Sequence, residues 1–313
     1  MTITSQSNAP RGLPPAAPGQ VAQGAGLSVG LAATLLVIGA LAMGSSPAFA
    51  RWSGLDMFAS AFWRAGLALP VLFIWAWVES RQRPAFFSTN KLVVLSGLAF
   101  AGDLAFWHIA IFNTTMANAT LLACLSPVWV LLLSNWVLGE HVTRAMFGGI
   151  VICIAGALLL VGGGIVAAPE RLWGDLAGLI TSFFFATYIL TFRFARRTTD
   201  VKPATLTFHS SVITAAALLV IALVSGETFL PTTIGGAIAL LALGIISHAG
   251  GQGLLAVAIG SLSAAFSSLV IFMEVVAAAF LGWAFFGEHL TAYQAAGGAL
   301  ILAGIFMARP RKG

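Results

Sequence analysis

Long apolar runs separated by short polar breaks fill almost the whole chain from residue 27 onward. A helix needs about 20 apolar residues in a row to cross the hydrocarbon core of a bilayer. The pattern therefore predicts an all-α membrane protein with ten transmembrane helices, at 27–46, 56–78, 91–112, 115–138, 145–163, 173–194, 203–224, 235–256, 261–286 and 292–308. Charge, proline and glycine punctuate the breaks between these runs, as at Arg81 to Pro84.

The polar positions also show that the chain is duplicated. The tripeptide Gly139, Glu140, His141 recurs as Gly287, Glu288, His289, at an offset of 148 residues. At the same offset, without a gap, Thr143 matches Thr291, Gly149 matches Gly297 and Gly156 matches Gly304. Because this period is close to half the chain, it indicates two copies of one unit and not a solenoid. We predict a first five-helix repeat at 27–163 and a second at 173–308.

Composition excludes an ordinary soluble fold. The chain is 59% hydrophobic and 8% charged, with a mean hydropathy of +0.98, whereas soluble domains carry about a quarter charged residues. The net charge of +5 does not indicate a nucleic-acid partner, because the basic residues gather in the loops of one side of the predicted bundle. Cys124 and Cys153 both fall inside predicted spans, so we expect no disulfide.

The distribution of Lys and Arg predicts the orientation. With the N-terminus in the cytoplasm, the cytoplasmic loops and tails receive 12 of these residues and the outer loops receive two, Arg51 and Arg171. This asymmetry predicts that both termini lie on the cytoplasmic side of the membrane, which we expect to be a bacterial-type inner membrane. Residues 1–26, rich in Pro, Gly, Gln and Ser, are expected to be a disordered cytoplasmic tail. Ala48 to Ala50 resemble a signal-peptidase site, but cleavage there would remove the first span and break the duplication, so we keep it.

Five spans per repeat is an odd number, so the second repeat must cross the membrane upside down relative to the first. Inverted repeats are typical of transporters, whose substrate site lies near the middle of the membrane where the repeats meet. The lipid bilayer and a small-molecule substrate are therefore the expected partners.

Two motifs resemble a known family. Gly139 to Thr143 and Gly287 to Thr291, each opening the last helix of a repeat, together with Leu125 to Val128, are similar to the EamA family of the drug/metabolite transporter superfamily. The resemblance covers roughly residues 27–308, and the chain is most similar to the YddG-type exporters of aromatic amino acids. It implies alternating-access export of amino acids. The second half departs from the family pattern, with Val275 after Glu274 where a proline is common.

Polar groups inside hydrocarbon are costly, and those that remain usually face the interior of the bundle or a water-filled cavity. Arg64 and Asp103 are expected about 12 Å below the outer ends of their spans, at 1.5 Å per residue. They can pair to hold two helices together, or serve as a gate or a substrate-facing charge. Glu274, near the middle of its span, can bind a substrate ammonium, carry a proton, or lie buried and neutral.

Histidines and aromatic residues complete the candidate substrate cavity. His248 lies in a glycine-rich stretch before Gln252, where the helix can unwind or let another backbone approach closely. The remaining candidates are either cavity residues or packing residues: His108, His209, Trp63, Trp107, Trp129 and Tyr188. Trp and Tyr also form belts at membrane interfaces, while deeper rings can stack on a substrate side chain. We expect the cavity to be lined by spans two, three, four, six, seven, eight and nine.

The repeated motif is expected to be structural. Glu140 and Glu288 stand just before the last helix of each repeat, where an acid complements the positive end of the helix dipole. Gly149 with Gly156, and Gly297 with Gly304, are seven residues apart and share a helix face, which allows close helix packing in lipid. These faces serve packing within the chain, with a homodimer surface as an open alternative.

No enzyme motif is present. The chain lacks a phosphate-binding Gly-x-x-x-x-Gly-Lys-Ser/Thr loop and a His-Glu-x-x-His zinc motif. We therefore expect no catalytic residue, no cofactor and no metal. Three rivals remain: an exporter of another metabolite, nucleoside or drug on the same fold; a membrane enzyme with a metal centre at His108, His209, His248 and Glu274; and a non-transporting scaffold.

Overall fold

A computed structural model of the chain describes residues 27–81, 90–114, 116–161, 169–286 and 291–308. Every regular element in these ranges is helical, which confirms the all-α prediction. The first half contains α1 (Val29–Met43), α2 (Ser46–Trp52), α3 (Met57–Gly66), α4 (Leu69–Ser80), α5 (Lys91–Asn113), α6 (Met116–Ala123), α7 (Ser126–Leu138) and α8 (Arg144–Val161). The second half contains the short η2 (Pro169–Arg171), α9 (Leu172–Thr198), α10 (Pro203–Val224), α11 (Ile234–Ala242), η3 (Leu243–Gln252), α12 (Gly253–Ala258), α13 (Ala264–Val270), α14 (Met273–Phe286) and α15 (Ala292–Ala308). The expected tail at 1–26 and the second tripeptide, Gly287 to His289, lie outside the described residues.

Seven helical stretches in the described ranges are long and apolar enough to cross a membrane: Val29–Trp52, Met57–Ser80, Lys91–Asn113, Ala119–Leu138, Pro169–Thr198, Pro203–Val224 and Ile234–Ala258. Three shorter apolar helices accompany them, at Arg144–Leu159, Ala264–Ala277 and Ala295–Ala308. The first predicted span was too short, because the helical stretch continues beyond residue 46 to Trp52.

Several spans are interrupted, which hydropathy alone did not predict. The first span divides into α1 and α2 at Gly44, and the second into α3 and α4 at Leu67 and Ala68. The stretch from Ile234 to Ala258 contains a π-helix, η3, that includes His248 and Gln252. The predicted spans 115–138 and 261–286 are each two short helices joined by a two-residue break. Such breaks expose backbone polar groups, and in lipid they are tolerated only where protein or a water-filled cavity surrounds them.

The glycine-rich segment of η3 allows two backbones to approach each other. A Cβ on Gly251 would lie 2.4 Å from Met43 Cγ, and a Cβ on Gly39 would lie 2.9 Å from the Gly251 carbonyl oxygen. The prediction of close backbone approach at this segment is therefore confirmed, and α1 is the helix that approaches. A π-helix is rare and is frequently found at functional sites.

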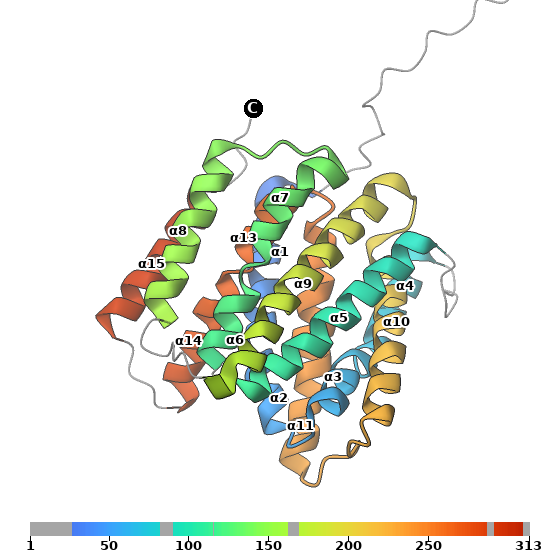
Figure 1. Cartoon of the computed structure of the whole chain (residues 1–313). Helices are drawn as coiled ribbons and strands as arrows, with labels where there is room; N and C mark the ends of the chain where they lie inside the picture. The colour runs from blue at the N-terminus through green and yellow to red at the C-terminus, as the bar shows by residue number, and fades with distance from the viewer. Residues whose placement is uncertain (1–26, 82–89, 115, 162–168, 287–290, 309–313) are drawn as a thin grey trace, which may run out of the picture.

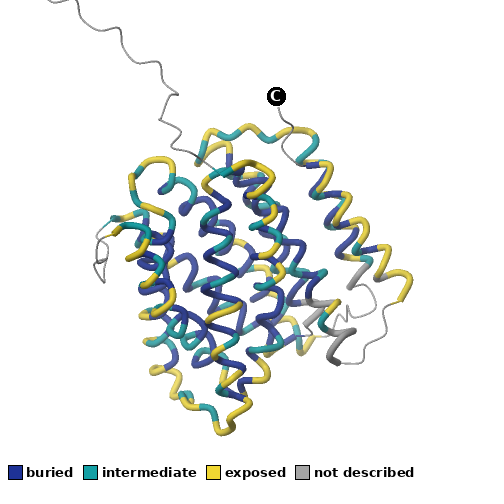
Figure 2. Tube along the Cα trace, turned by 180° about the vertical axis from the view of Figure 1, so that it is seen from behind, coloured by how far each residue is buried: buried dark blue, intermediate teal, exposed yellow. Residues whose placement is uncertain are grey.

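The helices form one bundle with α8 and α15 side by side at its edge (Figure 1). The start of α1 and the end of α15 lie at one end of the bundle, while α9 begins at the opposite end. Buried residues fill the interior, and exposed residues follow the outer helices and the loops (Figure 2). Much of this exposed surface is apolar, such as Phe147 on α8 and Phe306 on α15, as lipid contact requires.

The small-residue faces of α8 and α15 pack against each other. A Cβ on Gly156 would lie 2.7 Å from the Gly297 carbonyl oxygen, and a Cβ on Gly304 would lie 2.7 Å from the Gly149 carbonyl oxygen. Packing within the chain, one of the two alternatives for these glycines, is therefore what the structure shows. The glycine faces are covered and do not remain open to a second copy.

Candidate functional site

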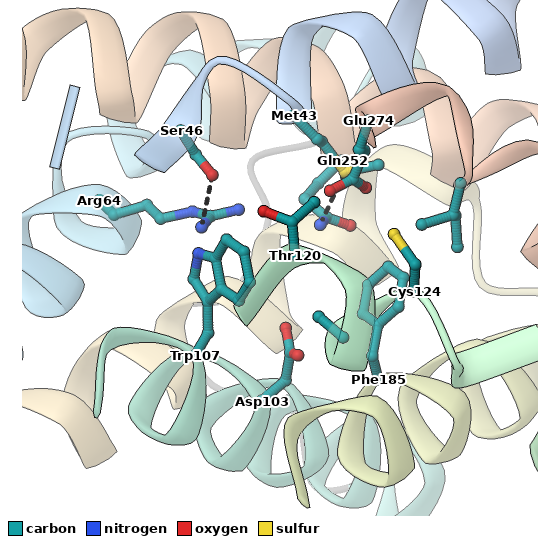
Figure 3. A pocket seen from close by; sticks show the side chains of 12 residues that line it. Met43, Ser46, Arg64, Asp103, Trp107, Thr120, Cys124, Phe185, Gln252 and Glu274 are labelled. Carbon is teal, nitrogen blue, oxygen red and sulfur yellow. Dashed lines mark hydrogen bonds between the residues drawn. The ribbon is translucent and has the colours of Figure 1, made fainter. Parts of the chain in front are cut away.

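A cavity lies between the two halves, at the level where the spans are interrupted (Figure 3). The positions inside it that the centre of a water molecule can occupy total about 40 Å³. Since about 10 to 15 Å³ by this measure holds one water, the cavity has room for roughly three. Its lining comes from both halves: Met43, Ser46, Arg64, Asp103, Trp107, Thr120, Ala123, Cys124, Phe185, Gln252, Ile271 and Glu274.

The cavity contains one positive and two acidic side chains. Arg64, near the end of α3, is 4% exposed, and Asp103, in the middle of α5, is 9% exposed. No ion pair joins these two residues in the described part of the chain, so the predicted direct pair is wrong. Arg64 Nη1 instead donates to Ser46 Oγ at 3.4 Å, and Asp103 Oδ1 accepts from Thr181 Oγ1 at 2.8 Å. Both side chains point toward the same cavity (Figure 3).

Several polar atoms at this cavity are left unpartnered by the described residues. Arg64 Nε and Gln252 Oε1 are buried without a hydrogen-bond partner, while Gln252 Nε2 donates to Met43 Sδ at 3.1 Å. Buried polar atoms without a partner are uncommon and costly. Here they point to a site that water or a ligand satisfies.

Glu274 stands at the start of α14, directly after the break between α13 and α14. It is half-buried, and its side chain faces the cavity opposite Asp103 and Phe185 (Figure 3). Trp107 and Phe185 provide the aromatic surface of the same cavity. The lining therefore combines opposite charges with apolar rings.

Three predicted aromatic residues lie outside this lining. Trp63 Nε1 donates to the Phe229 carbonyl oxygen at 2.6 Å, which attaches α3 to the segment between α10 and α11. Trp129 Nε1 donates to Ser182 Oγ at 2.9 Å and joins α7 to α9. Tyr188 is 2% exposed and stacks on Phe100 with ring centroids 4.6 Å apart. All three are placed as packing residues in this conformation.

The predicted histidines are also packing residues, and they do not form a cluster. His108 Nδ1–H donates to the Leu104 carbonyl oxygen at 2.8 Å, and His248 Nε2 is 3.0 Å from Ser211 Oγ. His209 is buried beside Phe208 on α10. No group of three or more metal-ligating side chains occurs among the described residues. The rival metal centre at these histidines and Glu274 is therefore wrong.

The lining also corrects the expected set of spans. The first span contributes Met43 and Ser46, which no charge or periodicity signal marked, whereas the seventh span, α10, contributes no lining residue. Cys124 and Ile271 were missed because they lie at helix breaks that hydropathy does not reveal, and Thr120 lies within α6, one turn before the first of these breaks. Five of the predicted cavity residues do converge: Arg64, Asp103, Trp107, Gln252 and Glu274. Both cysteines are free and buried, as expected.

Glu140 does not cap the helix that follows it. Its Oε1 forms an ion pair with Arg193 Nε and lies 3.4 Å from Arg197 Nη1, while its Oε2 accepts the Ala264 N–H at 2.9 Å. The N–H of Met146 in α8 is instead bonded by Thr143 Oγ1 at 3.2 Å. Glu140 therefore caps a helix, as predicted, but the helix is α13 and not α8. The sequence could not reveal this partner because α13 is distant in the chain. His141 is exposed.

Residues 30–162 and 172–309 each match the model of the EamA-like transporter family. The pseudopaline exporter CntI of Pseudomonas aeruginosa is 29% identical over 71% of this chain and 76% of its own length. An uncharacterized transporter of Archaeoglobus fulgidus is 28% identical over 81% of this chain and 88% of its own. A solved crystal structure with a TM-score of 0.73 is 23% identical and covers 89% of this chain and 96% of that one. At this identity it shows the fold alone.

Proposed function

The chain belongs to the EamA-like transporter family as a multi-pass membrane protein, and from this premise we propose that it exports amino acids by alternating access. The substrates would be aromatic or other apolar amino acids, as in the YddG-type exporters, leaving across the inner membrane. We further propose that the chain crosses the membrane ten times, as two inverted five-helix repeats at 27–163 and 173–308. The ten spans would be the seven long apolar stretches and the three shorter apolar helices.

Two features of the fold support inverted repeats. The two matched segments begin at residues 30 and 172, and the helices that contain these residues, α1 and α9, begin at opposite ends of the bundle (Figure 1). In addition, α6, α7 and α8 recur as α13, α14 and α15 at the offset of 148, with starts that agree within one residue. Both described ends of the chain lie at one end of the bundle, as expected for termini that are both cytoplasmic.

The observation that carries the proposal is the chemistry of the cavity. An amino acid has a carboxylate, an ammonium and a side chain. Arg64 can hold the carboxylate, because a guanidinium binds carboxylates in a two-pronged geometry. Asp103 and Glu274 can hold the ammonium, and Trp107 and Phe185 offer a stacking surface for an aromatic side chain.

The small size of the cavity indicates that this conformation does not hold substrate. Room for a few waters is far less than the several hundred cubic ångströms typical of ligand pockets. The helices around the cavity must therefore move apart before an amino acid enters. The breaks in α1–α2, α6–α7 and α13–α14 surround the cavity and are natural positions for this movement.

Counterflow in proteoliposomes tests the proposal. We expect purified protein to exchange labelled tryptophan or phenylalanine for the unlabelled amino acid on the other side of the membrane. Arg64→Gln should abolish this exchange, while Arg144→Gln, a matched change at the exposed start of α8, should leave it near wild type. Failure to move any amino acid, by a preparation that moves other solutes, would overturn the substrate assignment.

A second candidate keeps the fold and changes the cargo to another small metabolite. The relative named pseudopaline exporter favours it. A competition panel distinguishes the two, because an amino-acid exporter is inhibited by unlabelled aromatic amino acids at the concentrations at which it transports them. Inhibition by other small metabolites, with none by amino acids, would favour this second candidate.

A further inference from the structure

Glu140 lies in the loop between α7 and α8, and this loop is at the end of the bundle where α1 begins and α15 ends (Figure 1). It follows the last residues of α7, in the first half. Its two carboxylate oxygens bind different elements of the second half: Oε1 pairs with Arg193 on α9, and Oε2 accepts the N–H of Ala264, the first residue of α13. One side chain therefore fastens three elements.

Arg193 extends this cluster to a fourth element. Its Nη1 donates to the carbonyl oxygen of Ile259, directly after α12. One turn further along α9, Arg197 Nη1 donates to the carbonyl oxygen of Leu138, the last residue of α7, at 2.9 Å. The side chains of Glu140 and Arg193 are each 12% exposed. Removing one member of such a pair leaves the other charged and poorly solvated, so the pair is stable only as a unit.

The helix that Glu140 binds, α13, connects it to the substrate cavity. α13 is buried along its whole length. Ile271, in the break that follows α13, and Glu274, the second residue of α14, both line the cavity. Any movement that opens this end of the bundle between α7 and α13 must separate Glu140 from the Ala264 N–H.

We infer that Glu140 and Arg193 form the gating ion pair that closes the cavity at the end of the bundle where α1 begins and α15 ends. The inference rests on the proposed transport function, and it explains why the first Gly-Glu-His element sits beside α7. The carboxylate holds the N-terminus of α13 while the gate is closed. Breaking the pair frees α13 and gives the cavity access to that side.

Cys124 supplies a native reporter. It lines the cavity at 2% exposure, whereas the second cysteine, Cys153, is fully buried on α8, where its Sγ bonds to the Ile301 carbonyl oxygen on α15. A bulky, membrane-impermeant maleimide, added to vesicles on the side where α1 begins and α15 ends, reaches Cys124 only when this end opens. Cys124→Ser gives the blank, and reaction at Cys153 reports general loosening.

We expect Glu140→Gln and Arg193→Met each to raise the labelling rate of Cys124 by at least about tenfold, which corresponds to about 1.4 kcal/mol in favour of the open form. The double variant should label no faster than the faster single variant, because both remove the same interaction. Arg193→Lys keeps the positive charge but loses the planar guanidinium, so it should raise the Cys124 labelling rate less than Arg193→Met does. It also disturbs the protein less, because no charge is removed.

Glu227→Gln is the matched control. Glu227 Oε2 accepts the Ala59 N–H at 2.6 Å and so also binds the first turn of a helix in the other half. Glu227 belongs to the segment between α10 and α11, which lies at the opposite end of the bundle (Figure 1). It should leave the Cys124 rate within about twofold of wild type. Unchanged labelling in Glu140→Gln and Arg193→Lys, an equal rise in Glu227→Gln, or simultaneous reaction of Cys153 would each overturn the gate.

The labelling needs no substrate, so it separates this inference from the proposed function. If the protein moves no amino acid, yet Cys124 is labelled faster in Glu140→Gln and Arg193→Met, the gate is supported and the substrate assignment is wrong. A protein that transports amino acids with unchanged labelling in the variants retains its function and loses the gate.

Discussion

The helix pairs α6–α7 and α13–α14 occupy equivalent places in the two halves but carry different chemistry. Each pair is interrupted at the same point of the repeat, after Ala123 and after Val270. Each break contains an N–H that bonds to a carbonyl three residues back, as Leu125 does to Leu122 at 3.2 Å and Phe272 does to Leu269 at 3.2 Å. The backbone is conserved between the halves, while the side chains after each break are not.

The difference falls on Ser126 and Glu274, which match at the offset of 148. Ser126 is fully buried, its hydroxyl has no partner among the described residues, and it does not line the cavity. Glu274 lines the cavity and presents a carboxyl group to it. Duplication supplied two similar helix breaks, and the second received the carboxylate. The two repeats therefore share the same interrupted helix pair, whereas the side chains that form the site differ between them.

The largest expected effect tests this asymmetry. Glu274→Gln should lower amino-acid flux in proteoliposomes by about 10- to 100-fold, since hydrogen bonds to charged groups contribute about 1.5 to 3 kcal/mol. Ser126→Ala, at the equivalent position, should change flux by less than about twofold. Equal losses at the two positions would contradict the asymmetric site.

The next effect concerns the last helix of each repeat, α8 and α15. Gly156→Ala and Gly304→Ala should each destabilise the protein by about 1 to 3 kcal/mol, because the added methyl group would meet the backbone of the facing helix. Thermal unfolding in detergent measures the loss. Gly148→Ala is the control, because its methyl group would meet only the flexible end of Met307. A loss at only one of the two equivalent glycines would show that the halves pack differently.

A smaller effect is expected at the breaks themselves. Pro127 stands in the first turn of α7, whereas the equivalent residue in α14 is Val275, whose N–H bonds to the Phe272 carbonyl oxygen at 3.2 Å. Since α13–α14 is interrupted without a proline, Pro127→Val should keep the break. We expect a change in unfolding free energy below about 1 kcal/mol and flux near wild type. A large loss of flux would mean that proline is required in the first half alone.

The smallest effect is a pH dependence at the end of the bundle opposite Glu140. Burial raises the pKa of Glu227 above the ordinary 4.5, with a contribution from Asp56, although bonds from the Ala59 and Phe58 N–H groups act in the opposite direction. The folded carboxyl therefore holds its proton more readily than the unfolded one, and stability falls as the pH rises through the raised value. Glu227→Gln should flatten this slope just above pH 4.5 in thermal unfolding scans. An unchanged slope would assign it to another group.

The sequence determined the helical class, the positions of the apolar spans and the duplication. Hydropathy is a local property, so the spans at 203–224 and 292–308 match the structure at both ends. The tripeptide period located equivalent helices because both copies retain the same spacing. Arg64, Asp103 and Glu274 could be chosen from the sequence because a charge in an apolar run has few places to go other than an interior cavity.

Only the tertiary structure decided which partners these residues meet. Arg64 and Asp103 share a cavity without forming an ion pair, and Glu140 caps a helix more than a hundred residues away. The breaks in the first, second and ninth spans follow from packing around the cavity, which leaves no periodic trace in the sequence. Partners across the two halves depend on how the halves dock, and docking is set by the sum of many contacts that no single stretch of chain contains.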